Sequence, residues 1–420
     1  TASMPKGYNG DEAKVPAYVM LDPLKRDDGS VVTTRAQWGA RRAEILRAFE
    51  ENVFGKTPEA AKKFKPKYAV VEKDAPALDG LALRTQVDIA LAKAADAPVM
   101  HLLLYLPAKA KGPSPVVLGL NFAGNASVVD DPGIRATELW KPSAKRGELP
   151  TRVAFDEKRR GWQTQEWQVR MLLEHGYGLA TVYYGDIEPD ARDAVQLSVR
   201  QFYFAKGQTQ TQAKADAWGA LGAWAWGLSK AADYLRSLKM VDAKEIAVTG
   251  HSRLGKAADW AAAQDERFAA VLSTESGKGG QSLYRREFGE TIGHLEGSFP
   301  YWFCANYAQW VGKDREIPVD GNLLLALIAP RPLYVASAEG DLWSDPRGEF
   351  LSAVDVGRVY ALFGKRGLGT DAMPAVNEPV MGDLAYHVRS GKHDVTVFDW
   401  EQYVRFLDKE FGSPLSRGAR

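Results

Sequence analysis

Two kinds of apolar segment follow one another along this chain. Three early segments are bounded by turns, and the middle one alternates apolar and polar residues, which predicts antiparallel strands over residues 68–71, 81–89 and 99–106. The later runs are almost continuously apolar, as in strands that a parallel sheet buries on both faces. They lie at residues 116–121, 178–184, 246–249, 269–273 and 333–336, and a last strand is expected over 384–388.

Helical patterns separate the later strands. We expect helices over about residues 34–54, 164–175, 214–238, 253–264, 354–363 and 400–411. The last of these has Asp399 as its expected N-cap and Gln402 at the capping-box position. Strands that alternate with helices predict an α/β protein with a doubly wound, mostly parallel sheet sandwiched by helices, in three α/β/α layers.

One domain over residues 1–420 is the expected organisation, because the chain has no internal repeat and no low-complexity linker. About the first 60 residues should wrap this domain, beginning with a coil rich in Pro, Asp and Gly. The long segments 140–167 and 279–314 are expected to be insertions.

The composition narrows the class of protein. With 54 basic and 53 acidic residues the net charge is +1, which argues against nucleic-acid or anionic-membrane partners. No apolar run approaches the ~18–20 residues of a membrane helix. Cys304 is the only cysteine, so no intrachain disulfide can form. The sequence lacks an initiator Met, and we expect that a signal peptide has been removed from a secreted or periplasmic protein that acts as a monomer.

The candidate chemistry lies where the strand at residues 246–249 enters a glycine-flanked serine, Ser252, which a helical pattern follows. A strand, a tight turn and a helix are the arrangement that presents the nucleophile of an α/β-hydrolase. The usual spacing is G-x-S-x-G, whereas here the second glycine, Gly255, comes one residue later. A serine that merely caps the helix is the alternative. The segment also approaches a phosphate-binding loop, but Ala257 stands where that loop needs a hydroxyl.

A serine nucleophile needs a histidine base and a carboxylate that orients the base. Three histidines follow Ser252, and His393 lies in the loop before the C-terminal helix, where this fold places its base. His387 is expected to be a satisfied histidine within the sheet. Two carboxylates compete as the acid, and both follow predicted strands: Asp341 at the usual position and Glu275 one strand earlier. No metal-binding motif or cofactor fingerprint occurs, so none is expected.

At these residues the chain resembles the glucuronoyl esterases, carbohydrate esterase family 15, and particularly their bacterial members. The family elbow reads G-C-S-R-x-G-K, and here it is Gly250-His251-Ser252-Arg253-Leu254-Gly255-Lys256, with His in place of Cys. The segments around Glu275 and His393 are also similar to family motifs. The resemblance implies hydrolysis of esters between (4-O-methyl-)glucuronic acid of glucuronoxylan and lignin alcohols, without a cofactor.

The resemblance also implies roles for single residues. Ser252 would be the nucleophile, His393 the base and Glu275 the acid, which leaves the role of Asp341 open. Glu275→Ala is therefore expected to lower kcat more than Asp341→Ala. The remaining matches are Arg253 at the oxyanion and three residues at the sugar: Lys256, Glu290 and Trp343.

Two other functions are compatible with the same residues. An acetyl xylan esterase would share the serine, histidine and acid, but it would not need Arg253, Lys256 and Trp343 together. A non-catalytic carbohydrate-binding protein could keep the fold, and the 12 Trp, 16 Tyr and 16 Phe suit sugar binding as well as a large core.

Overall fold

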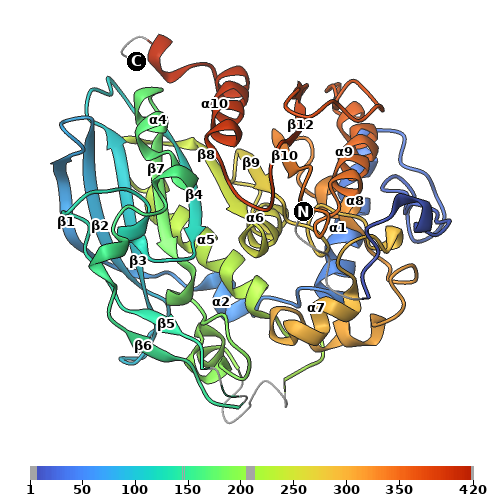
Figure 1. The fold of residues 1–420 in the computed structure, drawn as a ribbon, viewed down its shortest axis with the longest axis horizontal. Helices are drawn as coiled ribbons and strands as arrows, with labels where there is room; N and C mark the ends of the chain where they lie inside the picture. Colours follow the sequence, from blue (N-terminus) through green and yellow to red (C-terminus); the bar gives the residue numbers. More distant parts are fainter. Residues whose placement is uncertain (1–6, 144, 146, 205–212, 418–420) are drawn as a thin grey trace. The chain divides into compact units, whose positions relative to one another are not determined.

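Segments from distant parts of the sequence gather into two compact units (Figure 1). The computed structural model describes residues 7–143, 145, 147–204 and 213–417. The first unit comprises residues 1–56, 215–222 and 250–394, and the second comprises 57–214, 223–249 and 395–420. The chain passes from the second unit to the first within strand β8, immediately before Ser252.

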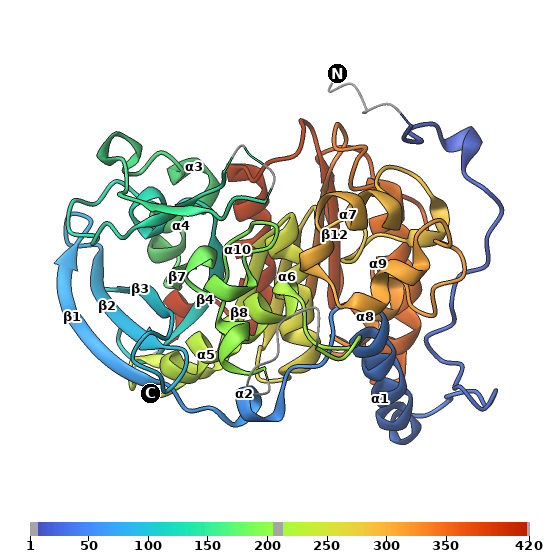
Figure 2. The ribbon, with the colours of Figure 1, turned by 90° about the horizontal axis from the view of Figure 1, so that it is seen from below.

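The second unit contains the antiparallel strands that the sequence predicts. Its strand order is β1 (Lys67–Ala77), β2 (Ala82–Ala90), β3 (Val99–Pro107), β7 (Gly178–Tyr183), β4 (Ser114–Asn121) and β8 (Val241–His251). The pairs from β1 to β7 are antiparallel, and the pairs β7–β4 and β4–β8 are parallel. Figure 2 shows β1, β2 and β3 as long, curved neighbouring strands. The helices of this unit are α2 (Glu59–Lys63), α3 (Thr164–Trp167), α4 (Val169–Glu174), most of α5 (Ala220–Arg236) and α10 (Val397–Phe411).

The first unit contains three parallel strands and one short antiparallel strand. Their order is β9 (Ala270–Thr274), β10 (Leu333–Ala338), β12 (Leu384–Arg389) and β11 (Val380–Met381). The helices of this unit are α1 (Arg35–Asn52), α6 (Arg253–Gln264), α7 (Ile292–Ser298), α8 (Gly321–Ala326) and α9 (Pro346–Ala361). Helix α6 packs against β9, and α9 packs against β10 and β12.

Burial explains which strands the hydropathy pattern identified. Strands β4, β7, β9 and β10 are buried along their whole length, as their unbroken apolar runs require. Strand β1 is exposed at most positions and carries several charges, which suits the edge of a sheet. The apolar pattern is therefore strongest where both faces of a strand are covered.

Several predicted helix boundaries were wrong. The single helix expected over 164–175 is broken at Gln168, whose φ of 42° is left-handed. Helix α9 begins at Pro346, eight residues before the expected start, because Asp345 caps its N-terminus. Asp399 is not the N-cap of α10. Thr396 is the cap, and Asp399, three residues on, accepts hydrogen bonds from its N–H and hydroxyl groups.

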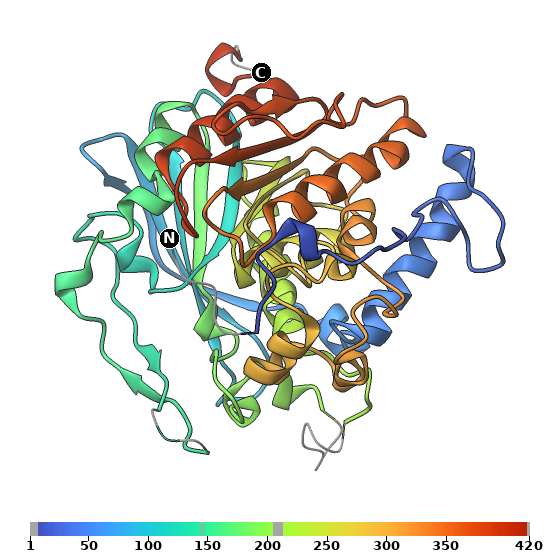
Figure 3. The ribbon, with the colours of Figure 1, turned by 45° about the vertical axis from the view of Figure 1, so that its right-hand side comes forward.

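The N-terminal segment and the two predicted insertions contain little regular structure. The coil before α1 contacts α8 and α9 within the first unit, through Leu21 O to Asn322 and through Asp22 to Arg358 (Figure 3). Segment 140–167 includes the two-stranded sheet of β5 (Leu139–Lys141) and β6 (Thr151–Val153), and segment 279–314 includes α7. One domain over residues 1–420 stays a prediction. Among the described residues, no helix combines the length and the apolar character needed to cross a bilayer.

A buried ion-pair cluster fixes the second unit. Arg84 on β2 donates two hydrogen bonds to Asp131, of 2.7 and 2.8 Å, and two to Glu72 on β1. Tyr105 on β3 donates to the same Asp131 carboxylate at 2.5 Å. The side chains of Arg84 and Asp131 are nearly buried, so loss of one partner would leave the other charge without compensation.

We predict that Arg84→Met lowers the free energy of unfolding by about 3–5 kcal/mol, the usual effect of breaking a buried pair. The matched control is Arg170→Met, which removes the exposed ion pair with Asp79 in the same unit and should change stability by about 0–1 kcal/mol. Urea denaturation followed by tryptophan fluorescence measures both. Equal losses for the two variants would contradict the assignment.

Candidate active site

Ser252 occupies a strained turn between β8 and α6. Its φ of 58° and ψ of −128° lie in a region that residues with a side chain rarely adopt. The backbone N–H of Ser252 donates to Thr274 O at the end of β9, at 2.9 Å. This strand–turn–helix is the elbow that the sequence predicts, and it holds Ser252 at the N-terminus of α6.

Close packing explains the two glycines of the elbow. A Cβ atom at Gly250 would lie 2.0 Å from Leu254 O, so no other residue fits without movement of the backbone. A Cβ atom at Gly255 would lie 3.0 Å from the Cβ of Ser276 and 3.2 Å from Gly250 O. The second glycine therefore allows α6 to approach both β8 and the loop after β9. Leu254, at the usual position of that glycine, is buried instead.

His393 lies between two buried carboxylates in the loop after β12. Its Nδ1 atom is 2.7 Å from Oδ2 of Asp341, a hydrogen bond, and 3.2 Å from Oε2 of Glu275. Asp341 follows β10 and Glu275 follows β9, so the ends of three neighbouring parallel strands supply the group. The structure brings His393, both candidate acids, Asp341 and Glu275, and the elbow residue His251 together.

Glu275 has several partners besides His393. Its Oε1 atom accepts a hydrogen bond from Arg389 at 3.0 Å, and its Oε2 atom accepts one from the N–H of Asp394 at 2.9 Å. Oε2 also lies 3.1 Å from Nε2 of His251. Because these groups already hold the Glu275 carboxylate, the distances favour Asp341 as the direct partner of His393. This is the reverse of the order that the resemblance implied.

The two other histidines after Ser252 lie on β12 and α7. His387 is fully buried on β12, and its Nδ1 atom lies 2.8 Å from the hydroxyl of Tyr334, so it is a satisfied histidine within the sheet as expected. His294 accepts the backbone N–H of Thr291 in the capping box of α7.

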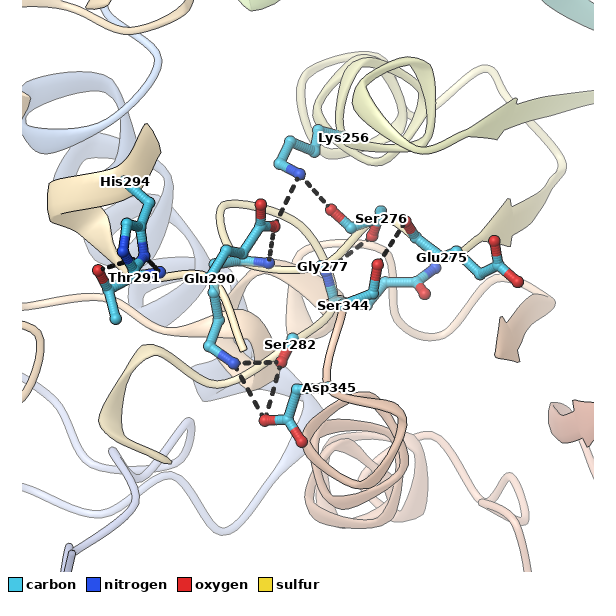
Figure 4. A network of polar contacts seen from close by, with 12 residues as sticks. Lys256, Glu275, Ser276, Gly277, Ser282, Glu290, Thr291, His294, Ser344 and Asp345 are labelled. Atoms are coloured by element: carbon cyan, nitrogen blue, oxygen red, sulfur yellow. Dashed lines mark hydrogen bonds and ion pairs between the residues drawn. The ribbon is translucent and has the colours of Figure 1, made fainter. Parts of the chain in front are cut away.

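Lys256 and Glu290 form a buried pair one turn beyond the elbow (Figure 4). The Lys256 ammonium donates to Ser276 O at 2.5 Å and lies 3.4 Å from Oε1 of Glu290. The same Glu290 oxygen accepts the backbone N–H of Lys278 at 3.0 Å. The pair offers a donor and an acceptor close together, which suits recognition of hydroxyl groups.

Trp343 belongs to an aromatic group that the sequence analysis missed. Tyr8, from the N-terminal coil, stacks on His294 with ring centroids 3.3 Å apart and lies 4.1 Å from the centroid of Trp343. Glu290 joins this group, because its N–H donates to Trp343 O at 3.0 Å. Burial and the nearby Glu290 charge raise the pKa of Tyr8. Nothing in the local sequence of Tyr8 signals this position, which depends on the path of the coil.

Arg253, the first residue of α6, packs against aromatic rings of segment 279–314. Its guanidinium carbon lies 4.7 Å from the ring centroid of Trp302 and 5.1 Å from that of Phe299. The two rings stack on each other at 3.8 Å. Cation–π contacts of this kind contribute about 0.5–2 kcal/mol and fix the orientation of the arginine. Phe299 and Trp302 are further residues that the sequence analysis did not assign to the site.

Buried polar groups support the loops around the site. Asp345 is fully buried and pairs with Lys278 at 3.0 Å and Arg286 at 2.9 Å, and Figure 4 shows it beside Ser282. Burial opposes ionisation of Asp345, but Lys278 and Arg286 outweigh it and lower its pKa.

Glu349 accepts the N–H of Gly277 at 3.0 Å and the hydroxyl of Ser337 at 2.6 Å, and burial raises its pKa well above the usual range.

Asp259 lies on α6, behind the elbow. Its carboxylate accepts hydrogen bonds from the hydroxyls of Ser273 and Ser276, both at 3.1 Å. Complete burial raises the pKa of Asp259 to about 7. Through these serines, Asp259 attaches α6 to the strand and loop that carry Glu275.

Comparison with known proteins places the chain in a family. A family model described as "Glucuronyl esterase, fungi" matches residues 191–364. "Carbohydrate esterase MZ0003", from an unknown prokaryotic organism, is 43% identical over 407 residues, which are 97% of this chain and 93% of that protein. "4-O-methyl-glucuronoyl methylesterase 1" from Wolfiporia cocos is 26% identical, over 87% of this chain and 75% of the fungal protein.

Solved structures agree over nearly the whole chain. A glucuronoyl esterase from Solibacter usitatus superposes with a TM-score of 0.89 and 48% identity, over 95% of this chain and all of that chain. A CE15 glucuronoyl esterase from Teredinibacter turnerae T7901 superposes with a TM-score of 0.81 and 31% identity, over 98% of this chain and 94% of that one. These two similar structures therefore indicate the fold of this chain as well as its family.

We predict that Gly250→Ala lowers kcat by at least about 100-fold, because its Cβ would collide with Leu254 O and displace the elbow, and a displacement of ~1 Å can have that effect. The matched control is Gly39→Ala on α1, where no atom lies within 4 Å of the added Cβ. Steady-state kinetics on an activated ester, with circular dichroism as a folding check, measures both. A folded Gly250→Ala protein with the parental kcat would contradict the packing argument.

Proposed function

This chain belongs to the glucuronoyl esterases of carbohydrate esterase family 15, and we propose that it cleaves esters between glucuronic acid on glucuronoxylan and the alcohols of lignin. It is a carboxylic ester hydrolase with the α/β-hydrolase fold that the sequence predicts. The observation that carries the substrate proposal is the juxtaposition of two groups around α6 and β9. One is His393 with its two carboxylates, and the other is the buried pair of Lys256 and Glu290.

Ser252 is the proposed nucleophile and His393 the proposed base. The Ser252 hydroxyl attacks the ester carbonyl while Nε2 of His393 takes its proton, which the imidazolium then gives to the leaving alcohol. A water molecule attacks the resulting acyl-enzyme in the same way, with His393 again as base, and releases glucuronic acid. The hydrogen bond from Nδ1 of His393 to Asp341 leaves Nε2 as the acceptor nitrogen that this step needs.

Arg253 is the proposed stabiliser of the oxyanion. Its backbone N–H is at the first position of α6, where helix N–H groups and the helix dipole favour negative charge. Its guanidinium, oriented by Trp302 and Phe299, adds a formal positive charge. In other hydrolases one neutral donor at this position contributes about 2.7–4 kcal/mol to the transition state.

Lys256, Glu290 and Trp343 are the proposed sugar-binding residues. A lysine donor and a carboxylate acceptor can bind vicinal hydroxyl groups of a pyranose, and the half-buried Trp343 ring can cover an apolar sugar face. Tyr8 and His294 extend this surface beside Trp343. Because the polymer substrate lies outside the cell, we infer that the enzyme is secreted or periplasmic.

The substrate proposal predicts that the protein hydrolyses the benzyl ester of glucuronic acid with a much higher kcat/KM than acetylated xylan. Benzyl alcohol or acetate released from each substrate measures the two rates. The matched variant is Ser252→Ala, which should lose turnover by about 10⁴-fold or more while still binding glucuronic acid in calorimetry.

Other outcomes separate the alternatives. Release of acetate alone would show that the protein is an acetyl xylan esterase and that the proposed glucuronoyl esterase activity is wrong. A parent protein that binds glucuronic acid but turns over neither ester would be a carbohydrate-binding protein on this fold.

For the two acids we predict that Asp341→Asn lowers kcat more than Glu275→Gln. Asp341 makes the shorter bond to His393, and loss of an orienting aspartate costs about 10⁴-fold in enzymes that have a single acid. The remaining Glu275 charge, 3.2 Å away, should make the loss smaller here. Both substitutions preserve shape, and Glu275→Gln retains an acceptor for Arg389. A larger loss in Glu275→Gln would restore the order that the family resemblance implied.

A further inference from the structure

We propose that His251, His393, Glu275 and Asp341 form a binding site for a divalent transition-metal ion, with Zn²⁺ as the best fit, and that the bound ion inhibits the esterase. The ion is not required for the proposed reaction. Its binding competes with the proton that His393 needs on Nδ1. The inhibition, but not the binding, rests on the proposed function of His393.

The ligand atoms are already almost as close as a metal ion would hold them. Nε2 of His251 lies 3.1 Å from Oε2 of Glu275, and Nδ1 of His393 lies 3.2 Å from the same oxygen. These three atoms all lie within 4.8 Å of one another. Zinc bonds of ~2.0–2.1 Å in tetrahedral geometry place ligand atoms about 3.3 Å apart. The two histidine nitrogens are within 4.8 Å of each other, so an approach of at most about 1.5 Å would bring all three atoms to this spacing.

Asp341 is the proposed fourth ligand, and it lies outside the group of three whose atoms are all within 4.8 Å of one another. Its Oδ2 atom is 2.7 Å from Nδ1 of His393, so it must retreat by about 0.6 Å to reach the ~3.3 Å spacing of a tetrahedral site. Two imidazole nitrogens with two carboxylate oxygens suit Zn²⁺ and other late transition metals better than Mg²⁺ or Ca²⁺, which prefer oxygen ligands alone.

The exposure of the ligands and the charges around them affect how a metal ion would enter the site and how tightly it would bind. The His393 side chain is 39% exposed and the His251 side chain is 19% exposed, whereas the two carboxylates are buried, so an ion would enter from the histidine side. Two carboxylates facing the position supply two negative charges. Arg389, which donates to Oε1 of Glu275, opposes a cation but also fixes the carboxylate orientation as outer partners of metal ligands do. We therefore expect weaker binding than at a structural zinc site.

The inhibition follows from the tautomer of His393. A neutral imidazole that ligates metal through Nδ1 carries its proton on Nε2. Nε2 then cannot accept the Ser252 proton, so the base is lost while the nucleophile remains in place. Metal binding displaces the Nδ1 proton of His393 and the Nε2 proton of His251, and each ring can hold its proton on the other nitrogen.

The binding test uses Co²⁺ and Zn²⁺ on the Ser252→Ala protein, which leaves all four ligands in place. Co²⁺ should give the intense visible absorption of a tetrahedral site, and Zn²⁺ should abolish it by displacement. His251→Gln in the same background should weaken Co²⁺ binding by at least about 10-fold. The matched control is His175→Gln, which removes an exposed histidine of the second unit and should leave binding unchanged. Octahedral Co²⁺ spectra, or equal affinities in all three proteins, would overturn the proposal.

The inhibition test uses the unsubstituted enzyme and the His251→Gln enzyme. Zn²⁺ should inhibit hydrolysis of the benzyl glucuronate ester, with full recovery on addition of a chelator, and the inhibition constant should rise at least 10-fold in His251→Gln, each relative to its own metal-free rate. Tetrahedral binding without inhibition would overturn the inhibitory half. A protein that hydrolyses no ester would refute the proposed function, while the Co²⁺ spectra would still decide whether the metal site exists.

Discussion

The buried carboxylate of Glu275 is the contact on which the geometry of the site depends. A buried charge must be satisfied by hydrogen bonds, because leaving it uncompensated costs several kcal/mol. Glu275 meets this requirement by accepting from Arg389 at the end of β12, from the N–H of Asp394, and from His251 at the end of β8. Since Glu275 itself follows β9, one side chain holds together the loops after three strands, including the loop that carries His393.

The two carboxylates beside His393 differ in their contacts. Asp341 makes the shorter contact, 2.7 Å from Nδ1 of His393, whereas Glu275 lies 3.2 Å away and also accepts the N–H of Asp394 in the same loop. Two carboxylates beside one imidazole raise the local negative potential. The same potential attracts cations, so these side chains also have the ligands of the proposed metal site.

The sequence predicted the features that depend on local pattern. The unbroken apolar runs located β4, β7, β9 and β10, because a strand that is buried on both faces has apolar residues at consecutive positions. The elbow was recognisable because its strand, glycines and serine are consecutive. The helix boundaries at Asp345 and Thr396 were missed, since each depends on a side-chain cap that the apolar period does not report.

The rest of the site could not be predicted because its residues come together only through the fold. Tyr8 reaches Trp343 across more than 300 positions of the chain, and Phe299 and Trp302 reach Arg253 from a segment with no regular pattern. The distances of the two carboxylates from His393 were likewise inaccessible, because they depend on Arg389 and Asp394, which bind Glu275.

His251 stands where the family motif has a cysteine, and it takes part both in the contacts of Glu275 and in the proposed metal site. A histidine at this position can donate to Glu275, which a cysteine does only weakly. Asp341 is the nearer partner of His393. His251 also supplies the second imidazole without which Glu275, Asp341 and His393 would offer only one nitrogen ligand to a metal. The motif's one departure from the pattern of the family therefore adds a partner to Glu275 and a second nitrogen to the proposed metal site.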